Sequence, residues 1–283
     1  MLNALLTPQG QKFDENAWNI YPRPQMRRDN YVNLNGLWEF AVSKDKKLPQ
    51  TYEKQIRLPF CPESALSGVE MEVEPGSYLF YRRKLTLPEG YKNGRVLLHI
   101  GAADQVADVF VNGRPMGIHY GGYTSFSLDI TPALKEENEL VIRVFDDLRD
   151  LTMPYGKQSL NRGGMWYTPV SGIWQTVWLE CVPNIYIESL QVEACADYGV
   201  MVRIRPEQDA MVIVEGLGEF PMKHGMTVIR PKDPHLWSPE DPHLYSFMVI
   251  TETDRVDSYF ALRKIEAKKV NGIPRLLLTG KPY

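Results

Sequence analysis

The chain has 283 residues, of which 43% are hydrophobic and 24% charged, a composition typical of a globular protein with material for two cores. Its net charge of −3 and the lack of an unbroken basic patch exclude nucleic acid as an expected partner. No segment reaches the roughly 20 apolar residues that span a bilayer, and the N-terminus lacks a signal-peptide pattern, so we expect no membrane partner and a bacterial-type cytoplasmic location.

The three cysteines, Cys61, Cys181 and Cys195, are odd in number and irregularly spaced. This pattern favours reduced, buried thiols over a disulfide framework or a zinc site. The five histidines show no metal-ligand spacing. We therefore expect neither a metal nor a cofactor.

Short runs of alternating apolar residues, separated by glycine and proline, predict an all-β protein. Four of these runs in the first part of the chain predict strands, at residues 95–100, 106–111, 139–145 and 176–181. Val96, Leu98 and Ile100 share one face of the first of them. Asn112-Gly113 follows the second run and favours a hairpin, because both residues tolerate positive φ.

A second series of strands is predicted after Pro183, with the spacing of about 8–12 residues that is typical of a β-sandwich. Its members are residues 185–192, 200–205, 210–215, 226–230, 244–251 and 257–265. The alternating strands and amphipathic helices of a (β/α)8 barrel are missing. Because the second series of strands begins after Pro183, we place the boundary between two β domains at Val182-Pro183-Asn184.

Several motifs stand in the order in which one enzyme family carries them. They are residues 21–25 (YPRPQ), 34–40 (LNGLWEF), 58–64 (LPFCPES), 81–83 (YRR), 109–113 (VFVNG), 117–126 (GIHYGGYTSF), 129–131 (DIT), 166–180 (WYTPVSGIWQTVWLE), 236–245 (LWSPEDPHLY), 260–266 (FALRKIE) and 276–283 (LLLTGKPY). By these motifs the chain resembles the N-terminal part of glycoside hydrolase family 2 over nearly its whole length.

The resemblance implies a domain organisation. Residues 1–183 would form a sugar-binding-type (galactose-binding-like) jelly-roll β-sandwich, and residues 184–266 an immunoglobulin-like β-sandwich. Residues 267–283 would lead into a catalytic (β/α)8 barrel that is missing from this chain. The leucines of residues 276–278 have an incomplete pairing partner by this interpretation, so we expect the tail to be poorly ordered or to pair with another molecule.

No catalytic residue is expected in the chain. Retaining glycosidases use two carboxyl groups about 5–5.5 Å apart, and the resemblance implies that both lie on barrel strands beyond Tyr283. Asn138-Glu139 resembles the Asn-Glu pair that marks the family's acid/base. It follows an acidic turn and opens a strand, so we interpret it as a solvated turn.

The resemblance also implies a loop that reaches the active site just before residues 170–173. Known galactosidases and glucuronidases carry an Asp six residues before the Gly that matches Gly172, and here that position is Trp166. Trp166 is a candidate for stacking on a sugar ring and equally for structural packing. Asn161 and Arg162 supply polar groups on the same loop.

Glu63 lies in a segment, 60–63, that matches another relative's sugar contact. It is the fourth candidate substrate-binding residue, although a solvated loop acid is the more frequent role for such a residue.

The predicted function is that of the non-catalytic N-terminal part of a retaining β-glycosidase, acting as scaffold and substrate-site support. The opening motifs and residues 121–124 are similar to the β-galactosidase branch, so β-galactosides are the predicted substrate, ahead of β-glucuronides and β-mannosides. The expected partners are a β-glycoside, the barrel domain and, in a homo-oligomer, further copies of the chain. A free carbohydrate-binding module and an immunoglobulin-type interaction protein are the alternatives.

Overall fold

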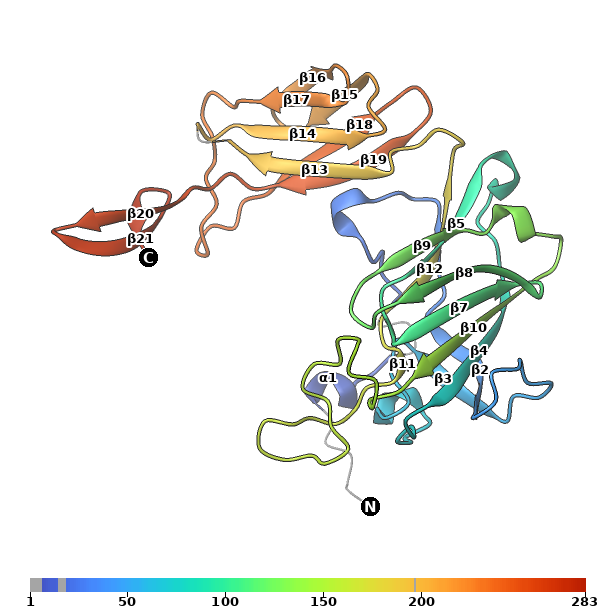
Figure 1. The fold of residues 1–283 in the computed structure, drawn as a ribbon. Coiled ribbons are helices and arrows are strands. Elements are labelled where there is room, and N and C mark those ends of the chain that lie inside the picture. The colour runs from blue at the N-terminus through green and yellow to red at the C-terminus, as the bar shows by residue number, and fades with distance from the viewer. Residues whose placement is uncertain (1–6, 15–18, 196) are drawn as a thin grey trace. The chain divides into compact units, whose positions relative to one another are not determined.

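The computed structural model describes residues 7–14, 19–195 and 197–283 (Figure 1). The chain divides into two compact units: a first unit that ends at Pro22 and resumes over Asn30–Val182, and a second unit made of Arg23–Asp29 and Pro183–Tyr283. The short segment 23–29 thus belongs with the second unit, whereas the sequence analysis placed it in the first domain.

Strands dominate both units. The helices among the described residues are single turns: α1 (Pro8–Gln11), η1 (Pro24–Met26), η2 (Ala65–Ser67), η3 (Tyr91–Asn93) and η4 (Thr131–Ala133). None of these described helices has the length or apolarity to cross a membrane. All pairings between the named strands are antiparallel, so the predicted all-β fold is confirmed.

The first unit is a jelly-roll β-sandwich of two sheets, with one further small strand pair. In spatial order the six-stranded sheet contains β3 (Lys54–Leu58), β2 (Gly36–Ser43), β4 (Ser77–Leu85), β10 (Asn138–Asp146), β7 (Val106–Val111) and β8 (Arg114–Tyr120). The four-stranded sheet contains β1 (Tyr31–Asn33), β12 (Val177–Val182), β5 (Arg95–Ile100) and β9 (Phe126–Asp129). The small pair is β6 (Ala103–Asp104) with β11 (Gly172–Ile173), which ends the longest loop of the unit.

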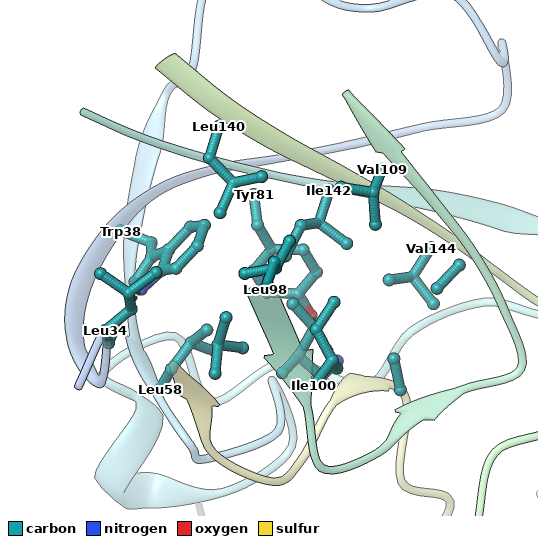
Figure 2. Packing of buried hydrophobic residues seen from close by; sticks show 14 of the residues in the cluster. Leu34, Trp38, Leu58, Tyr81, Leu98, Ile100, Val109, Leu140, Ile142 and Val144 are labelled. Carbon is teal, nitrogen blue, oxygen red and sulfur yellow. Dashed lines mark hydrogen bonds between the residues drawn. The ribbon is translucent and has the colours of Figure 1, made fainter. Parts of the chain in front are cut away.

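One core lies between the two larger sheets (Figure 2). Leu98 and Ile100 on β5 and Leu140, Ile142 and Val144 on β10 are all within 1% of complete burial. Burying each such side chain stabilises the fold by about 1.5–3 kcal/mol. The alternation predicted for residues 95–100 and 139–145 is therefore confirmed, because every second residue of these strands enters this core.

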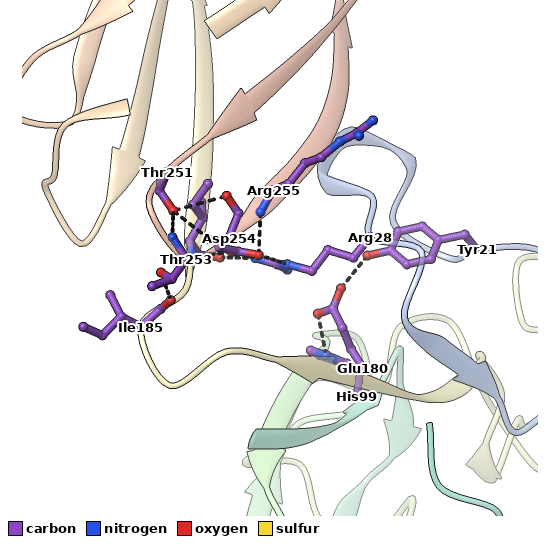
Figure 3. Close-up of polar contacts among 10 residues, drawn as sticks. Tyr21, Arg28, His99, Glu180, Ile185, Thr251, Thr253, Asp254 and Arg255 are labelled. Atoms are coloured by element: carbon purple, nitrogen blue, oxygen red, sulfur yellow. Dashed lines mark hydrogen bonds and ion pairs between the residues drawn. The ribbon is translucent and has the colours of Figure 1, made fainter. Parts of the chain in front are cut away.

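Strand β12 is buried on both of its faces. On the face away from the core, the Tyr21 hydroxyl donates a hydrogen bond of 2.8 Å to Oε1 of the fully buried Glu180 (Figure 3). The Tyr21 ring meets the Trp178 ring edge-on at 5.1 Å, and the His99 ring stacks on Trp178 at 4.0 Å. The segment before β1 thus covers this part of the sheet.

The second unit is an immunoglobulin-like β-sandwich around a core of its own. One sheet contains β13 (Ser189–Ala194), β14 (Val200–Arg205) and β17 (Met226–Ile229). The other contains β16 (Gly218–Met222), β15 (Ala210–Val214), β18 (Tyr245–Ile250) and β19 (Arg255–Phe260). β16 was not predicted; it carries Pro221, which a strand tolerates at a sheet edge, where β16 lies.

The predicted strand 257–265 is two strands, because β19 ends at Phe260 and Ile265 opens a separate hairpin. That hairpin pairs β20 (Ile265–Val270) with β21 (Ile273–Leu278), and β22 (Lys281–Pro282) adds a third strand. Asn271 and Gly272 form its turn with φ of 53° and 77°. The expectation of an unpaired tail is wrong, since β21 finds its partner within the chain.

Candidate functional site

The loop of residues 147–171 carries three of the four predicted substrate-binding residues (Figure 1). It leaves β10 at Asp146 and returns to β11 at Gly172. Its middle doubles back on itself: the Tyr167 amide donates to the Lys157 carbonyl at 2.8 Å, and the Ser159 amide donates to the Tyr167 carbonyl at 3.1 Å. These backbone hydrogen bonds give the loop a fixed shape without a regular sheet.

Trp166 lies at the tip of this folded loop. Its backbone exchanges two hydrogen bonds with Gly163, of 3.1 and 3.3 Å, which close a tight turn. Its side chain is 40% exposed, and that of the adjacent Tyr167 is 62% exposed. The tip therefore presents two neighbouring aromatic residues to solvent, and Tyr167 was not singled out in the sequence although it directly follows Trp166.

Arg162 and Asn161 precede the turn and are both exposed. The Arg162 guanidinium forms an ion pair with Glu72 and donates a hydrogen bond of 3.3 Å to the Thr168 hydroxyl. The Asn161 backbone amide is bound by the Ser159 hydroxyl, and its side chain lies among exposed neighbours. The turn thus gathers a cation and an amide beside Trp166 in sequence.

Glu63 contacts the same loop at its C-terminal end. Its Oε2 accepts a hydrogen bond of 3.1 Å from the Ser171 amide. Burial raises the pKa of Glu63, while its hydrogen bonds, those to Ser171 among them, lower it in part. The interpretation of Glu63 as a solvated loop acid is therefore wrong, because its carboxylate is largely enclosed and anchors the base of the loop.

Two further carboxylates lie at this base and were missed by the sequence analysis. Asp104 and Asp146 are 3% and 4% exposed. Burial raises the pKa of Asp146 to about 7; the Ser171 hydroxyl opposes this, and the charges of Asp104 and Glu63 add to it. Burial raises the pKa of Asp104 as well. Each acid is the last residue of a strand, β6 and β10 respectively, and nothing in the sequence alone marks it as buried.

The Asn138-Glu139 pair lies at the start of β10, at the opposite end of this strand from the 147–171 loop. Glu139 is exposed at the start of β10, with its amide bound to the Asn112 side chain at 3.0 Å and Arg82 4.0 Å from its carboxylate. Its neighbour Asn138 is buried, so only half of this pair is solvated. Over residues 7–14, 19–195 and 197–283, no three His, Cys, Asp or Glu side chains are placed to hold a metal ion.

The chain is similar to several known glycosidases over part of their length. The family described as glycosyl hydrolase 2 galactose-binding domain-like matches residues 60–158. A β-galactosidase of Thermoanaerobacter pseudethanolicus is 28% identical over 72% of this chain and 30% of its own length. The β-glucuronidase of Rattus norvegicus is 25% identical over 93% of this chain and 48% of its own length.

A solved β-glucuronidase structure from an uncultured Clostridium species has the same fold. It superimposes with a TM-score of 0.69 at 24% identity, over 94% of this chain and 49% of that one. The present chain thus spans less than half the length of each of these three proteins. These findings confirm that the chain resembles the N-terminal domains of glycoside hydrolase family 2, whose galactose-binding-like domain matches residues 60–158.

Proposed function

We propose that these two domains are the non-catalytic, substrate-supporting part of a family 2 β-glycosidase. The observation that carries this proposal is the exposed tip of the 147–171 loop, where Trp166 stands close in sequence to Arg162 on a loop whose base is buried. An aromatic face stacks on the apolar face of a sugar ring, and a guanidinium binds hydroxyl or carboxylate oxygens. A loop fixed at its base holds such groups at low entropic cost.

The cleavage chemistry would come from another domain. Retaining hydrolysis needs an acid/base and a nucleophilic carboxyl about 5–5.5 Å apart and open to the sugar. The close carboxylates of this chain, Glu63, Asp104 and Asp146, are enclosed beneath the loop. Glu139, the exposed residue that resembles an acid/base, lies beside Arg82 on the strand surface.

β-Galactosides remain the substrate that we propose from the opening motifs, and the T. pseudethanolicus relative bears that name. β-Glucuronides are the second candidate, and the comparisons favour them, because most of the relatives are β-glucuronidases, the rat protein and the superimposed structure among them. Arg162 can bind either sugar, but the paired N–H donors of its planar guanidinium match the carboxylate of a uronic acid better than a single hydroxyl.

Ligand-observed saturation-transfer NMR tests this function with methyl β-galactoside and methyl β-glucuronide. Binding should be weaker than millimolar, since a millimolar Kd already corresponds to about −4.1 kcal/mol and only part of the sugar is contacted. Trp166→Ala should remove the signal. Trp237→Ala, in the second unit, serves as the matched control and should keep it.

The absence of a saturation-transfer signal for both sugars would contradict the proposal, and so would a signal that persists in Trp166→Ala. Micromolar affinity lost in Trp166→Ala would instead support a self-sufficient carbohydrate-binding module.

A further inference from the structure

Gln158 connects three parts of the first unit through one side-chain amide. Its Nε2 donates to Oδ2 of Asp104 at 3.0 Å and to the Tyr123 hydroxyl at 3.2 Å. Its Oε1 accepts a hydrogen bond from the Val170 amide. Gln158 thus joins the outgoing half of the 147–171 loop both to the returning half and to the sheet beneath.

Asp104 is the fixed end of this connection. It lies on β6, paired with Gly172 on β11, and is almost fully buried. Its carboxylate packs so closely on Gly122 that a Cβ there would come within 2.3 Å of Oδ1. Asp104 is therefore positioned by the pairing of its strand with β11 and by the contact of its side chain with Gly122.

The three contacts require the chemistry of an amide. Asp104 as a carboxylate only accepts hydrogen bonds, and the Val170 amide only donates them. A side chain that binds both needs an acceptor and a donor a short distance apart, which glutamine supplies. Apolar residues supply neither, and an ionised glutamate supplies only acceptors.

We propose that Gln158 is the positioning residue of the 147–171 loop, and that its amide, seated on Asp104, sets how Trp166 and Arg162 are presented to a sugar. The link to sugar rests on the proposed function, whereas the seating of the loop is a property of the first unit alone. The Gln158 amide carries no proton that titrates, so its donor and acceptor atoms stay the same across neutral pH.

Gln158→Glu turns this contact into a pH-dependent one. The introduced carboxyl, when protonated, can donate to Asp104 and still accept from Val170, whereas the ionised form faces a carboxylate at hydrogen-bond distance. Asp104 is the acid in contact with this position, Glu63 and Asp146 interact electrostatically with Asp104, and Tyr123 is the other polar neighbour of Gln158. Because burial raises the pKa of Asp104, a protonated Asp104 can also donate to the introduced carboxylate, so the repulsion develops only at a pH where both carboxyls are ionised.

The test is hydrogen exchange of the 283-residue chain, followed by mass spectrometry at pH 5 and pH 8, with each variant compared with wild type at the same pH. In Gln158→Ala the peptides covering residues 157–171 should exchange at least about tenfold faster at both values, since a hydrogen bond to a charged group is lost. In Gln158→Glu the same peptides should exchange as in wild type at pH 5. At pH 8 they should exchange as fast as in Gln158→Ala.

Two controls separate positioning from general damage. Lys157→Ala removes the adjacent exposed side chain but keeps the carbonyl that binds Tyr167, and should exchange like wild type. Gln191→Glu makes the same charge change at an exposed position of β13, and its exchange should match that of wild type at both pH values.

Wild-type exchange of residues 157–171 in Gln158→Ala, or pH-independent behaviour of Gln158→Glu, would overturn the proposal. Faster loop exchange in a chain that gives no sugar signal would support the positioning role and contradict the proposed function alone.

Discussion

Arg28 and Asp254 form a buried two-point ion pair between residues that are 226 positions apart in the sequence (Figure 3). Nε and Nη2 of Arg28 bind the two carboxylate oxygens at 3.1 and 2.6 Å, and the two side chains are 5% and 4% exposed. The Ile187 backbone donates to Asp254 and accepts from Arg28, at 2.7 and 2.8 Å. This pair explains why residues 23–29 belong to the second unit.

Asp254→Ala should destabilise the second unit by about 3–5 kcal/mol, because it leaves the Arg28 guanidinium buried without its counter-charge. Urea unfolding measures this change. Arg255→Ala breaks an exposed ion pair with Asp257 and should cost less than about 1 kcal/mol. Equal effects of the two substitutions would contradict the structural role of the Arg28 pair.

The stability of the first unit should fall as the pH rises towards about 7, because burial raises the pKa of Asp146 to about that value from its ordinary 3.8. A group whose folded-state pKa is raised contributes stability that is fully present below its unfolded pKa and is lost as the pH rises through its folded pKa. Asp146→Asn keeps the shape without the titration.

The urea midpoint of Asp146→Asn should therefore change less between pH 5 and 8 than that of wild type, with the variant the more stable protein at pH 8. Asp233→Asn, at an exposed position, is the control. Identical pH curves for wild type and Asp146→Asn would show that Asp146 does not take up the proton.

The terminal hairpin should promote self-association through one face. Ile265 and Leu276 are 65% and 64% exposed, and the register places them on the same side of β20 and β21. Leu276→Asp should shift sedimentation velocity towards the monomer, whereas Arg275→Asp, on the opposite side, should not. If both variants associate as wild type does, this face is not the contact.

The chain alone should hydrolyse no aryl β-galactoside, β-glucuronide or β-mannoside above background, because the carboxyl groups beneath the 147–171 loop are enclosed and Glu139 lies beside Arg82. A chromogenic assay of the purified chain measures this. Turnover that disappears in Glu139→Gln would place a catalytic acid where we assign an exposed strand residue.

Local patterns predicted much of the sandwich. The apolar alternation of residues 95–100 reflects the packing of one face of β5 on the core. Asn112-Gly113 predicted the turn between β7 and β8, where both residues have a positive φ. The burial of Glu180 could not be predicted, because it depends on Tyr21, a residue 159 positions away. The β16 strand escaped prediction because an edge strand needs little apolar alternation.

The candidate site was predicted only in its exposed part. Trp166, Asn161 and Arg162 were found through a motif, and the structure places them on one loop. Its base was not found, since Asp104 meets Gln158, 54 positions away, only once the chain has folded. The anchoring role of Glu63 was missed for the same reason, because its partner Ser171 is 108 residues away.

The most direct measurement of the central claim, that the 147–171 loop contacts sugar, is a protein-observed ¹⁵N NMR titration of the chain with methyl β-galactoside and methyl β-glucuronide. We expect shift changes at the Trp166 indole N–H and at amides of residues 161–168, growing linearly up to about 1 mM as weak binding requires, and absent from the second unit. Chemical-shift changes confined to the second unit would contradict the proposed site. So would the absence of shift changes in the loop at sugar concentrations that saturate another part of the chain.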